Sequence, residues 1–227
     1  MPDTNQLATI VPMQQYKYVL LDWDGNLART LDIWLAALKV PLEKRGIYLS
    51  DEEIGANFMV FKERMKARGI KDVDAMIDEA DAIATREVPN VELYPDAIVV
   101  LAELKKAGVR LVLVTTSRHD QIDPLLSKYN MTELFDFVVC GEDTTHQKPN
   151  PEPLEKALEL LDAYSDRGMA VMVGDSSADI EAAHNASIDS ILFYPPSHSK
   201  YYDLERLREY RPTYVVHDLR ELLQITQ

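Results

Sequence analysis

Two aspartates separated by a single residue follow an apolar run near the start of the chain. The stretch Tyr18–Leu27 reads YVLLDWDGNL, so Asp22 and Asp24 come directly after a predicted buried strand and just before Gly25. Two carboxylates held this close repel each other unless a cation or a shared proton relieves the repulsion. The pattern therefore predicts a charged site at the end of this strand.

Further polar residues follow the other apolar runs that we predict to be strands. They are Thr115, Thr116 and Ser117 after VRLVLV, Lys148 in the loop after FDFVVC, and Asp175 and Asp179 after MAVMV. In open parallel sheets, ligands bind beyond the carboxyl ends of the strands. We therefore expect these side chains to lie close to the first two aspartates.

This combination of groups suits phosphoryl transfer assisted by a hard cation. Oxygen ligands from Asp22 and Asp175 suit Mg²⁺, which also keeps several water ligands. One aspartate of the first pair would attack phosphorus and form an acyl phosphate, while the other would serve as general acid and then as general base. Thr115, the backbone amides after it and Lys148 would hold the charge of the transferred phosphoryl group. Gly25 allows a close approach of the backbone.

Alternating strands and helices must position these groups. After residue 94, predicted helices alternate with apolar runs. The helices lie near 96–106, 120–130 and 178–186, with one more that begins near 151, and the apolar runs lie near 109–115, 135–140, 169–173 and 190–194. A final predicted strand, TYVV, and a final predicted helix, DLRELLQI, complete the series. Continuous apolar strands that alternate with helices are typical of a parallel sheet covered on both faces. The sequence thus predicts an α/β core with a doubly wound, Rossmann-like sheet.

Residues 28–93 interrupt this alternation, because they show helical spacing and no convincing strand. Three helices are predicted, at 30–46, 50–69 and 72–88. We expect Pro41 to kink or break the first, and a capping box of Ser50 and Glu53 to open the second. The block therefore reads as a compact helical insert.

Length, charge and cysteine content narrow the class of protein. The 227 residues fit one large domain or a core with an inserted module. The net charge of −14 disfavours general binding to nucleic-acid phosphates, and a phosphorylated substrate would need a cation or a local basic pocket. A single cysteine, Cys140, excludes an intramolecular disulfide and a cysteine zinc site.

No apolar stretch approaches the length of a membrane span, and residues 1–16 read as a loose tail without a basic start. We therefore expect a soluble cytoplasmic protein without a nucleic-acid or membrane partner. The sequence does not indicate its oligomeric state.

The four polar clusters resemble the four motifs of the haloacid dehalogenase superfamily. DWDGNL, LVLVTTS, KPNP and VGDSSAD stand in the order of that family, and the likeness covers nearly the whole chain from residue 17. The stretch ELYPDAIVVLAELKKAGVRLVLVTTS is similar to the branch of phosphoglycolate-phosphatase-like and β-phosphoglucomutase-like proteins. The resemblance implies a core formed by residues 17–27 and 94–227 and a helical C1 cap formed by residues 28–93.

The resemblance also implies a role for each residue of the site. Asp22 would be the nucleophile and Asp24 the general acid and base. Mg²⁺ would be bound by Asp22, the backbone carbonyl of Asp24, and Asp175, with Asp179 acting behind these ligands or through water. Thr115 and Lys148 would hold the phosphoryl group and the nucleophile. The remaining substrate-binding positions would be Gly25, Asn26, Thr116 and Ser117.

Two residues depart from the pattern of the family. Asn26 stands where threonine or valine is commoner, and Trp23 between the aspartates is similar to the related phosphonatases. Those enzymes have alanine at the position of Asp24, so Asp24 favours phosphate-ester chemistry. We therefore expect Mg²⁺-dependent hydrolysis of a small phosphorylated metabolite. A phosphosugar mutase of the β-phosphoglucomutase type, a pyrophosphatase and a non-catalytic phosphate-binding module stay open as alternatives.

Overall fold

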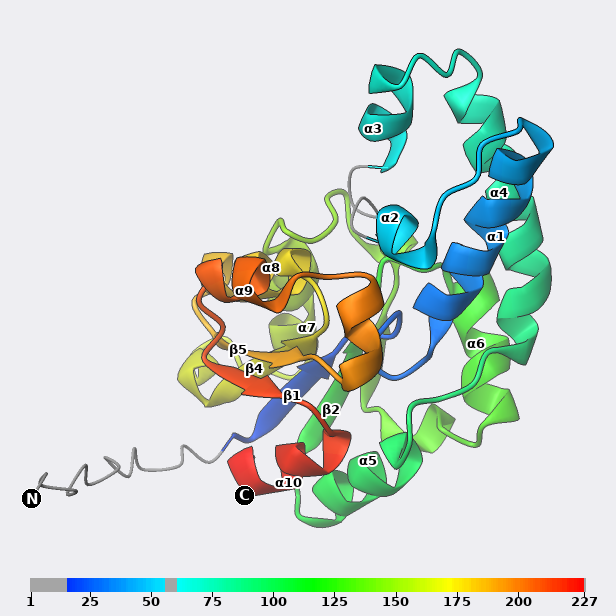
Figure 1. Cartoon of the computed structure of the whole chain (residues 1–227). Helices are drawn as coiled ribbons and strands as arrows, with labels where there is room; N and C mark the ends of the chain where they lie inside the picture. Colours follow the sequence, from blue (N-terminus) through cyan, green and yellow to red (C-terminus); the bar gives the residue numbers. More distant parts are fainter. Residues whose placement is uncertain (1–15, 56–60, 227) are drawn as a thin grey trace, which may run out of the picture.

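One parallel sheet forms the centre of the structure, a computed structural model that describes residues 16–55 and 61–226 (Figure 1). Within these residues the sheet has six strands, in the order β3-β2-β1-β4-β5-β6. The strands are β1 (Tyr18–Leu21), β2 (Arg110–Val114), β3 (Phe137–Val139), β4 (Ala170–Gly174), β5 (Asp189–Phe193) and β6 (Tyr214–Val216). In the central register, Leu21 lies between Leu113 and Val173. The predicted doubly wound α/β core is confirmed.

Helices cover both faces of this sheet. The helices of the core are α5 (Ala97–Lys106), α6 (His119–Lys128), α7 (Glu152–Leu160), α8 (Ser177–Asn185), α9 (Leu204–Glu209) and α10 (Leu222–Ile225). Side chains alternate along β1: Leu21 packs in the buried cluster with α5, α6 and α10, whereas Leu20 packs in the cluster with α7 and α8. Burial on both sides explains why the strands read as continuous apolar runs.

A second group of helices lies between β1 and α5 in the sequence. These are α1 (Thr30–Lys44), α2 (Asp51–Gly55), α3 (Phe61–Ala67) and α4 (Val73–Glu87), and they share a buried cluster of their own. The predicted capping box is present, since Ser50 and Glu53 exchange hydrogen bonds between side chain and backbone. The predicted helix at 50–69 is instead described as two, and residues 56–60 between them lie outside the described part of the chain.

The expected break at Pro41 is absent, because α1 continues through it to Lys44. Proline removes one hydrogen bond of a helix. Pro41 lies in the last turn and is itself buried, so packing against the other helices maintains the helical path. The carbonyl of Pro41 also accepts a hydrogen bond from the side chain of Arg45 (2.9 Å).

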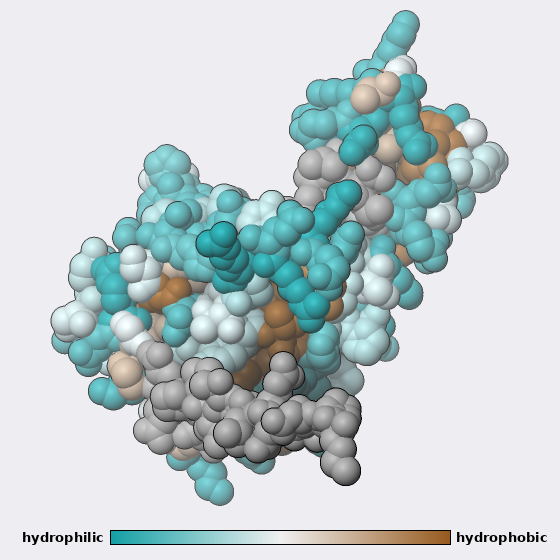
Figure 2. All heavy atoms as spheres, turned by 60° about the vertical axis from the view of Figure 1, so that its left-hand side comes forward, coloured by the Kyte–Doolittle hydropathy of each residue, from teal (hydrophilic) through white to brown (hydrophobic). Residues whose placement is uncertain are grey.

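The chain leaves and re-enters the core at one place. Ala28 forms an antiparallel bridge with Leu93. The amide of Arg29 donates to the carbonyl of Glu92 (2.8 Å), and that of Tyr94 donates to the carbonyl of Leu27 (2.9 Å). The helical block therefore projects from the core on a short two-stranded neck, and Figure 2 shows it as a separate lobe at the upper right.

Three observations concern the ends and the surface of the chain. The tail predicted at 1–16 lies outside the described residues except for Tyr16, which is buried and donates a hydrogen bond to Asp189 (2.7 Å). The surface in Figure 2 is mostly hydrophilic, in keeping with the net charge of −14. Among the described residues, no helix combines the length and apolar character that crossing a membrane requires.

Candidate active site

The predicted site residues converge at the carboxyl edge of the sheet, on the side where β1 points toward α1 and α2 (Figure 1). Asp22 directly follows β1, Thr115 directly follows β2, and Asp175 directly follows β4. Lys148 reaches the same place from the loop after β3, because its ammonium contacts Asp22. Three neighbouring strands thus deliver separate parts of the sequence to one spot.

Lys148 is the organising cation of this group. Its Nζ lies 2.8 Å from Asp22 Oδ1 and 2.7 Å from Asp179 Oδ1, and it donates to the carbonyl of Val114 (3.0 Å). These contacts use all three donors of the ammonium. The side chain is only 4% exposed. Lys148 is therefore held rigidly, with its charge directed at two buried carboxylates.

One ammonium does not neutralise the negative charge of the site. Burial, followed by the charges of Asp179 and Asp24, raises the pKa of Asp22 to about 7, although Lys148 opposes this shift. Burial and the neighbouring carboxylates also raise the pKa of Asp175 well above its usual range. Carboxyl groups in this condition favour the binding of a further positive charge.

The arrangement fits a bound divalent cation. Asp22, Asp175 and Asp179 are buried and offer carboxylate oxygens that lie within 4.8 Å of one another. Asp175 Oδ2 has no hydrogen-bond partner among the described residues. A set of carboxylate oxygens is the kind of site that Mg²⁺ occupies. The backbone carbonyl of Asp24 is also expected to bind the cation, and this role stays a prediction.

Gly25 makes room for this oxygen. Its φ of +70° favours glycine, and a Cβ built on it would lie 2.2 Å from Asp175 Oδ2. A side chain at this position would therefore collide with the unpartnered carboxylate oxygen. The absence of a side chain brings the loop after β1 against the end of β4.

Asp24 lies on the more open side of the site, since it is only partly buried. The hydroxyl of Ser117 donates to Asp24 Oδ2 (2.8 Å), and the amide of Ser117 donates to Oγ1 of Thr115 (3.1 Å). Ser117, predicted as a substrate-binding residue, therefore also holds the predicted general acid. Thr116 is exposed between them.

Asp179 and Asn26 lie behind these groups. The Oδ2 of Asp179 accepts hydrogen bonds from the amide and the hydroxyl of Ser176 (3.1 and 2.7 Å), which anchors the carboxylate at the start of α8. Asn26 is fully buried and donates to the carbonyl of Asp22 (3.0 Å). Its side chain thus stabilises the turn after β1, and the substrate contact predicted for it stays a prediction.

One residue next to the site was not predicted. Burial, followed by the charge of Asp175, raises the pKa of Tyr202 well above its usual range. Tyr202 lies between β5 and α9, in a stretch rich in proline, serine and histidine that has no helical or strand period. Its tyrosine pair, Tyr201 and Tyr202, was the one available signal.

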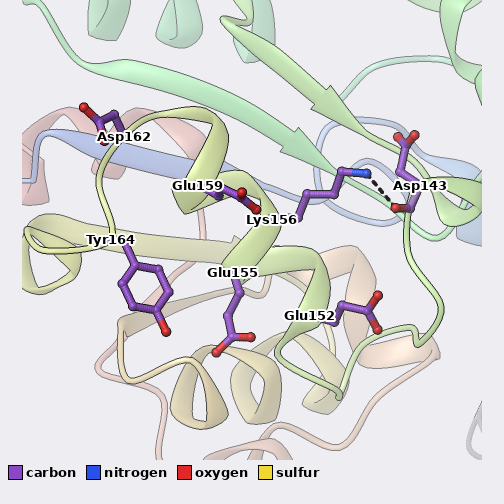
Figure 3. A pocket seen from close by; sticks show the side chains of 7 residues that line it. All are labelled: Asp143, Glu152, Glu155, Lys156, Glu159, Asp162 and Tyr164. Atoms are coloured by element: carbon purple, nitrogen blue, oxygen red, sulfur yellow. Dashed lines mark hydrogen bonds between the residues drawn. The ribbon is translucent and has the colours of Figure 1, made fainter.

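A separate hollow of about 650 Å³ lies along α7, away from this site. Figure 3 shows that its wall is acidic, with Lys156 among the carboxylates, and the ammonium of Lys156 donates to the backbone carbonyl of Asp143 (2.6 Å). None of the predicted site residues lines it. The hollow therefore adds nothing to the chemistry described above.

Comparison with known proteins agrees with the motifs. The family model of haloacid dehalogenase-like hydrolases matches residues 19–193. The pyrophosphatase PpaX of Bacillus cereus (strain G9842) is 36% identical over 217 residues, which cover 91% of this chain and 94% of that protein.

Solved structures share the fold. A protein of Haemophilus somnus 129PT, described as a predicted phosphoglycolate phosphatase, has a TM-score of 0.75 at 23% identity and covers 95% of this chain and 100% of its own. A conserved haloacid dehalogenase-like protein of unknown function from Agrobacterium tumefaciens C58 has a TM-score of 0.81 at 19% identity, with 92% and 97% covered.

Proposed function

The chain belongs to the haloacid dehalogenase-like hydrolases, and from this premise we propose that it is a Mg²⁺-dependent phosphatase that transfers the phosphoryl group of a small phosphomonoester to Asp22. The observation that carries the proposal is the contact of Lys148 with both Asp22 and Asp179, next to the unpartnered oxygen of Asp175. A buried nucleophile, a fixed ammonium and spare carboxylate oxygens are the parts that phosphoryl transfer through an aspartate requires.

In the first half-reaction, Asp22 attacks phosphorus. Lys148 holds Oδ1 of this carboxylate, which leaves Oδ2 to form the new bond to phosphorus as the bond to the leaving oxygen breaks. Asp24 gives its proton to that oxygen, and the Ser117 hydroxyl keeps the acid in place. The products are the free alcohol and an aspartyl phosphate.

In the second half-reaction, Asp24 takes a proton from water as the water oxygen bonds to phosphorus. The bond between phosphorus and Asp22 breaks, so inorganic phosphate leaves and the carboxylate is restored. Thr115 and the amide of Thr116 donate to the phosphoryl oxygens in both steps, since the amide of Ser117 donates to Thr115 Oγ1. When bound by Asp22 and Asp175, Mg²⁺ supplies positive charge against the carboxylates and the phosphoryl group.

We propose that residues 28–93 act as a cap on this site. The helices α1 to α4 share a buried cluster of their own and project from the core on the neck at Ala28 and Leu93. Such an element can exclude bulk water and select the leaving group. The core would then supply the phosphoryl chemistry and the cap the substrate preference.

Pyrophosphate is a second candidate substrate. The named activity of the Bacillus cereus relative favours it, because that protein matches 91% of this chain at 36% identity. Transfer to Asp22 would use the same groups, with phosphate as the leaving group. The two substrates therefore differ in what the cap must accommodate, not in the catalytic residues.

Phosphate release tests the proposal. Wild-type protein is assayed with phosphoglycolate, sugar phosphates, nucleotides and pyrophosphate, with and without Mg²⁺. We expect Mg²⁺-dependent release that Asp22→Asn abolishes, whereas the control Asp166→Asn, at a carboxylate whose side chain is 54% exposed, retains it. Isomerised sugar phosphate without free phosphate would identify a mutase instead. Full activity of a deamidation-free Asp22→Asn protein would refute transfer to Asp22.

A further inference from the structure

One segment of the core sequence reaches into the helical block. It connects β5 to α9 and contains a 3₁₀ turn, Pro196–Lys200, followed by Tyr201 and Tyr202. Tyr201 is 3% exposed and belongs to the buried cluster of α1 to α4, although it is far from those helices in sequence. Tyr202 packs against that cluster and also against a core cluster that contains Leu192. We call residues 196–202 the strap.

The backbones of the strap and of α2 approach very closely. A Cβ added to Gly55, the last residue of α2, would lie 1.7 Å from the carbonyl oxygen of Lys200 and 3.0 Å from the Cα of Tyr201. Figure 1 shows the turn of the strap, in orange, below α2. Because the atoms in contact belong to two backbones, neither side can make room by changing a side-chain rotamer.

The strap is also bonded to the strand of the neck that enters the block, through Asp32 on α1. The hydroxyl of Tyr201 donates to Oδ1 of Asp32, and Nη2 of Arg29 donates to Oδ2 of the same carboxylate (2.8 Å). Arg29 is itself a residue of the neck, since its amide donates to the carbonyl of Glu92 (2.8 Å). One carboxylate thus joins the strap to the place where the chain enters the block.

His198 bonds the strap to the strand of the neck that returns to the core. The imidazole is fully buried, and its Nε2 lies 2.6 Å from the hydroxyl of Tyr94, a residue of that strand. Five aromatic rings meet the imidazole edge-on, with centroid distances of 5.6 to 6.4 Å. They belong to Tyr94, Phe193, Tyr194, Tyr201 and Tyr202. A buried imidazole ringed in this way leaves the turn little freedom to shift.

These contacts add a third attachment between the block and the core. The two covalent connections cross at the neck, so the block would rotate about this point relative to the core. The strap contacts α2 and is bonded to both strands of the neck. A rotation that moves α1 and α2 away from the core must therefore break the bond between Tyr201 and Asp32 and separate Gly55 from Lys200.

We propose that the strap is a lock that holds the helical block in one orientation relative to the core. This inference goes beyond the proposed function, because the orientation of the block does not depend on the reaction that the core performs. Where the block acts as the proposed cap, release of the strap is the step that opens the site.

Distances between two spin labels, one on the block and one on the core, test the lock. The labels are placed at the exposed positions Glu63→Cys on α3 and Glu159→Cys on α7, in a protein that also carries Cys140→Ala. With the natural strap and α2, we expect a single narrow distribution of distances. Gly55→Ala should shift or split this distribution, because the locked arrangement has no room for its Cβ. The control is Gly168→Ala, whose Cβ would meet no atom within 4 Å, and it should leave the distribution unchanged.

A second variant acts through the hydrogen bond instead of the backbone contact. Tyr201→Phe keeps the ring in the buried cluster and removes only the hydroxyl that binds Asp32. We expect the ratio of released to locked block to rise by about tenfold or more, because the bond is made to a charged group. The same distance measurement detects the released block as a second population. The control Tyr48→Phe removes a hydroxyl from a residue of the block that is 78% exposed, and it should change nothing.

Each outcome has a distinct meaning. A distribution that both Gly55→Ala and Tyr201→Phe leave as it is in the natural protein overturns the lock. If Gly55→Ala fails to fold, an unchanged distribution in Tyr201→Phe is enough to overturn it, and so are several orientations in the natural protein. None of these measurements needs substrate, so any such result leaves the proposed function intact. Wild-type protein that releases no phosphate refutes the proposed function and leaves the lock standing.

Discussion

Replacing His198 should remove a specific part of the pH dependence of stability. Burial lowers the pKa of this histidine to about 4, against 6.5 for an ordinary imidazole, although the charge of Asp32 opposes the shift. Its Nδ1 has no hydrogen-bond partner among the described residues. The native protein therefore holds a neutral imidazole that the unfolded chain would protonate first.

The sign and size of the effect follow from these two pKa values. Between pH 6.5 and 4 the unfolded chain binds one more proton at His198 than the native protein does, so the free energy of unfolding falls as the pH falls. Relative to neutral pH, the loss from this group is about 2 kcal/mol at pH 5 and about 3 kcal/mol at pH 4. A loss of this size is a large part of the stability of an ordinary domain.

Urea unfolding at pH 7.5, 6 and 5 measures how much His198 contributes to the pH dependence of the free energy of unfolding. His198→Gln keeps a side chain able to hydrogen-bond Tyr94 but cannot titrate. It should be less stable than wild type at pH 7.5, because it disturbs the ring of aromatic contacts. The difference from wild type should then shrink by about 2 kcal/mol at pH 5. The control is His146→Gln, at a histidine whose side chain is 65% exposed. It shows how far the loss of an exposed histidine changes the free energy of unfolding over the same pH range.

A difference between wild type and His198→Gln that stays constant from pH 7.5 to 5 would refute the reasoning. It would mean that the native protein accepts the proton as readily as the unfolded chain does. The aromatic surroundings of His198 would then not exclude its charged form.

Three further predictions concern the site. Gly25→Ala should abolish Mg²⁺ binding in calorimetry, because its Cβ would lie 2.2 Å from Asp175 Oδ2. The control is Gly46→Ala, whose backbone has the same φ of +70° but whose Cβ would meet no atom within 4 Å. This control should bind Mg²⁺ normally and lose only about 1–2 kcal/mol of stability in urea unfolding. Lys148→Met should lose phosphatase activity and about 3 kcal/mol of stability at pH 7.5 in urea unfolding, since it leaves two buried carboxylates unpaired; retained activity would exclude the role of the ammonium. Ser117→Ala should reduce kcat in steady-state phosphate release by about tenfold and alter its pH profile, because the general acid loses its hydrogen bond; an unchanged profile would assign the hydroxyl to packing alone.

The core could be predicted from the sequence because its signals are local. The stretches LVLV within β2 and AVMV within β4 are apolar at every position, which is typical of short strands buried on both faces. The site followed from the same rule, since parallel strands bring their carboxyl ends to one edge. We could therefore assign Asp22, Thr115 and Asp175 to one site without any knowledge of side-chain packing.

Other features depend on packing between distant residues and could not be predicted in this way. The bond between Ser117 and Asp24 spans 93 positions, and Lys148 is paired with Asp22, which follows β1, and with Asp179, which lies in α8. Pro41 was expected to kink or break a helix that packing carries through to Lys44. Tyr202 lies in a stretch without a helical or strand period, so only the adjacent pair of tyrosines marks it in the sequence.

The neck at Ala28 and Leu93 has an evolutionary consequence. To the core, the whole helical block is equivalent to one long loop, because both of its connections cross at a single point. Such a block can be lengthened, shortened or exchanged between relatives without shifting the strands on either side. Tyr201 limits this freedom, since it lies in the core sequence yet is buried in the block. A transplanted block would therefore have to bring residues 196–202 with it, so we expect the two segments to be inherited as a pair.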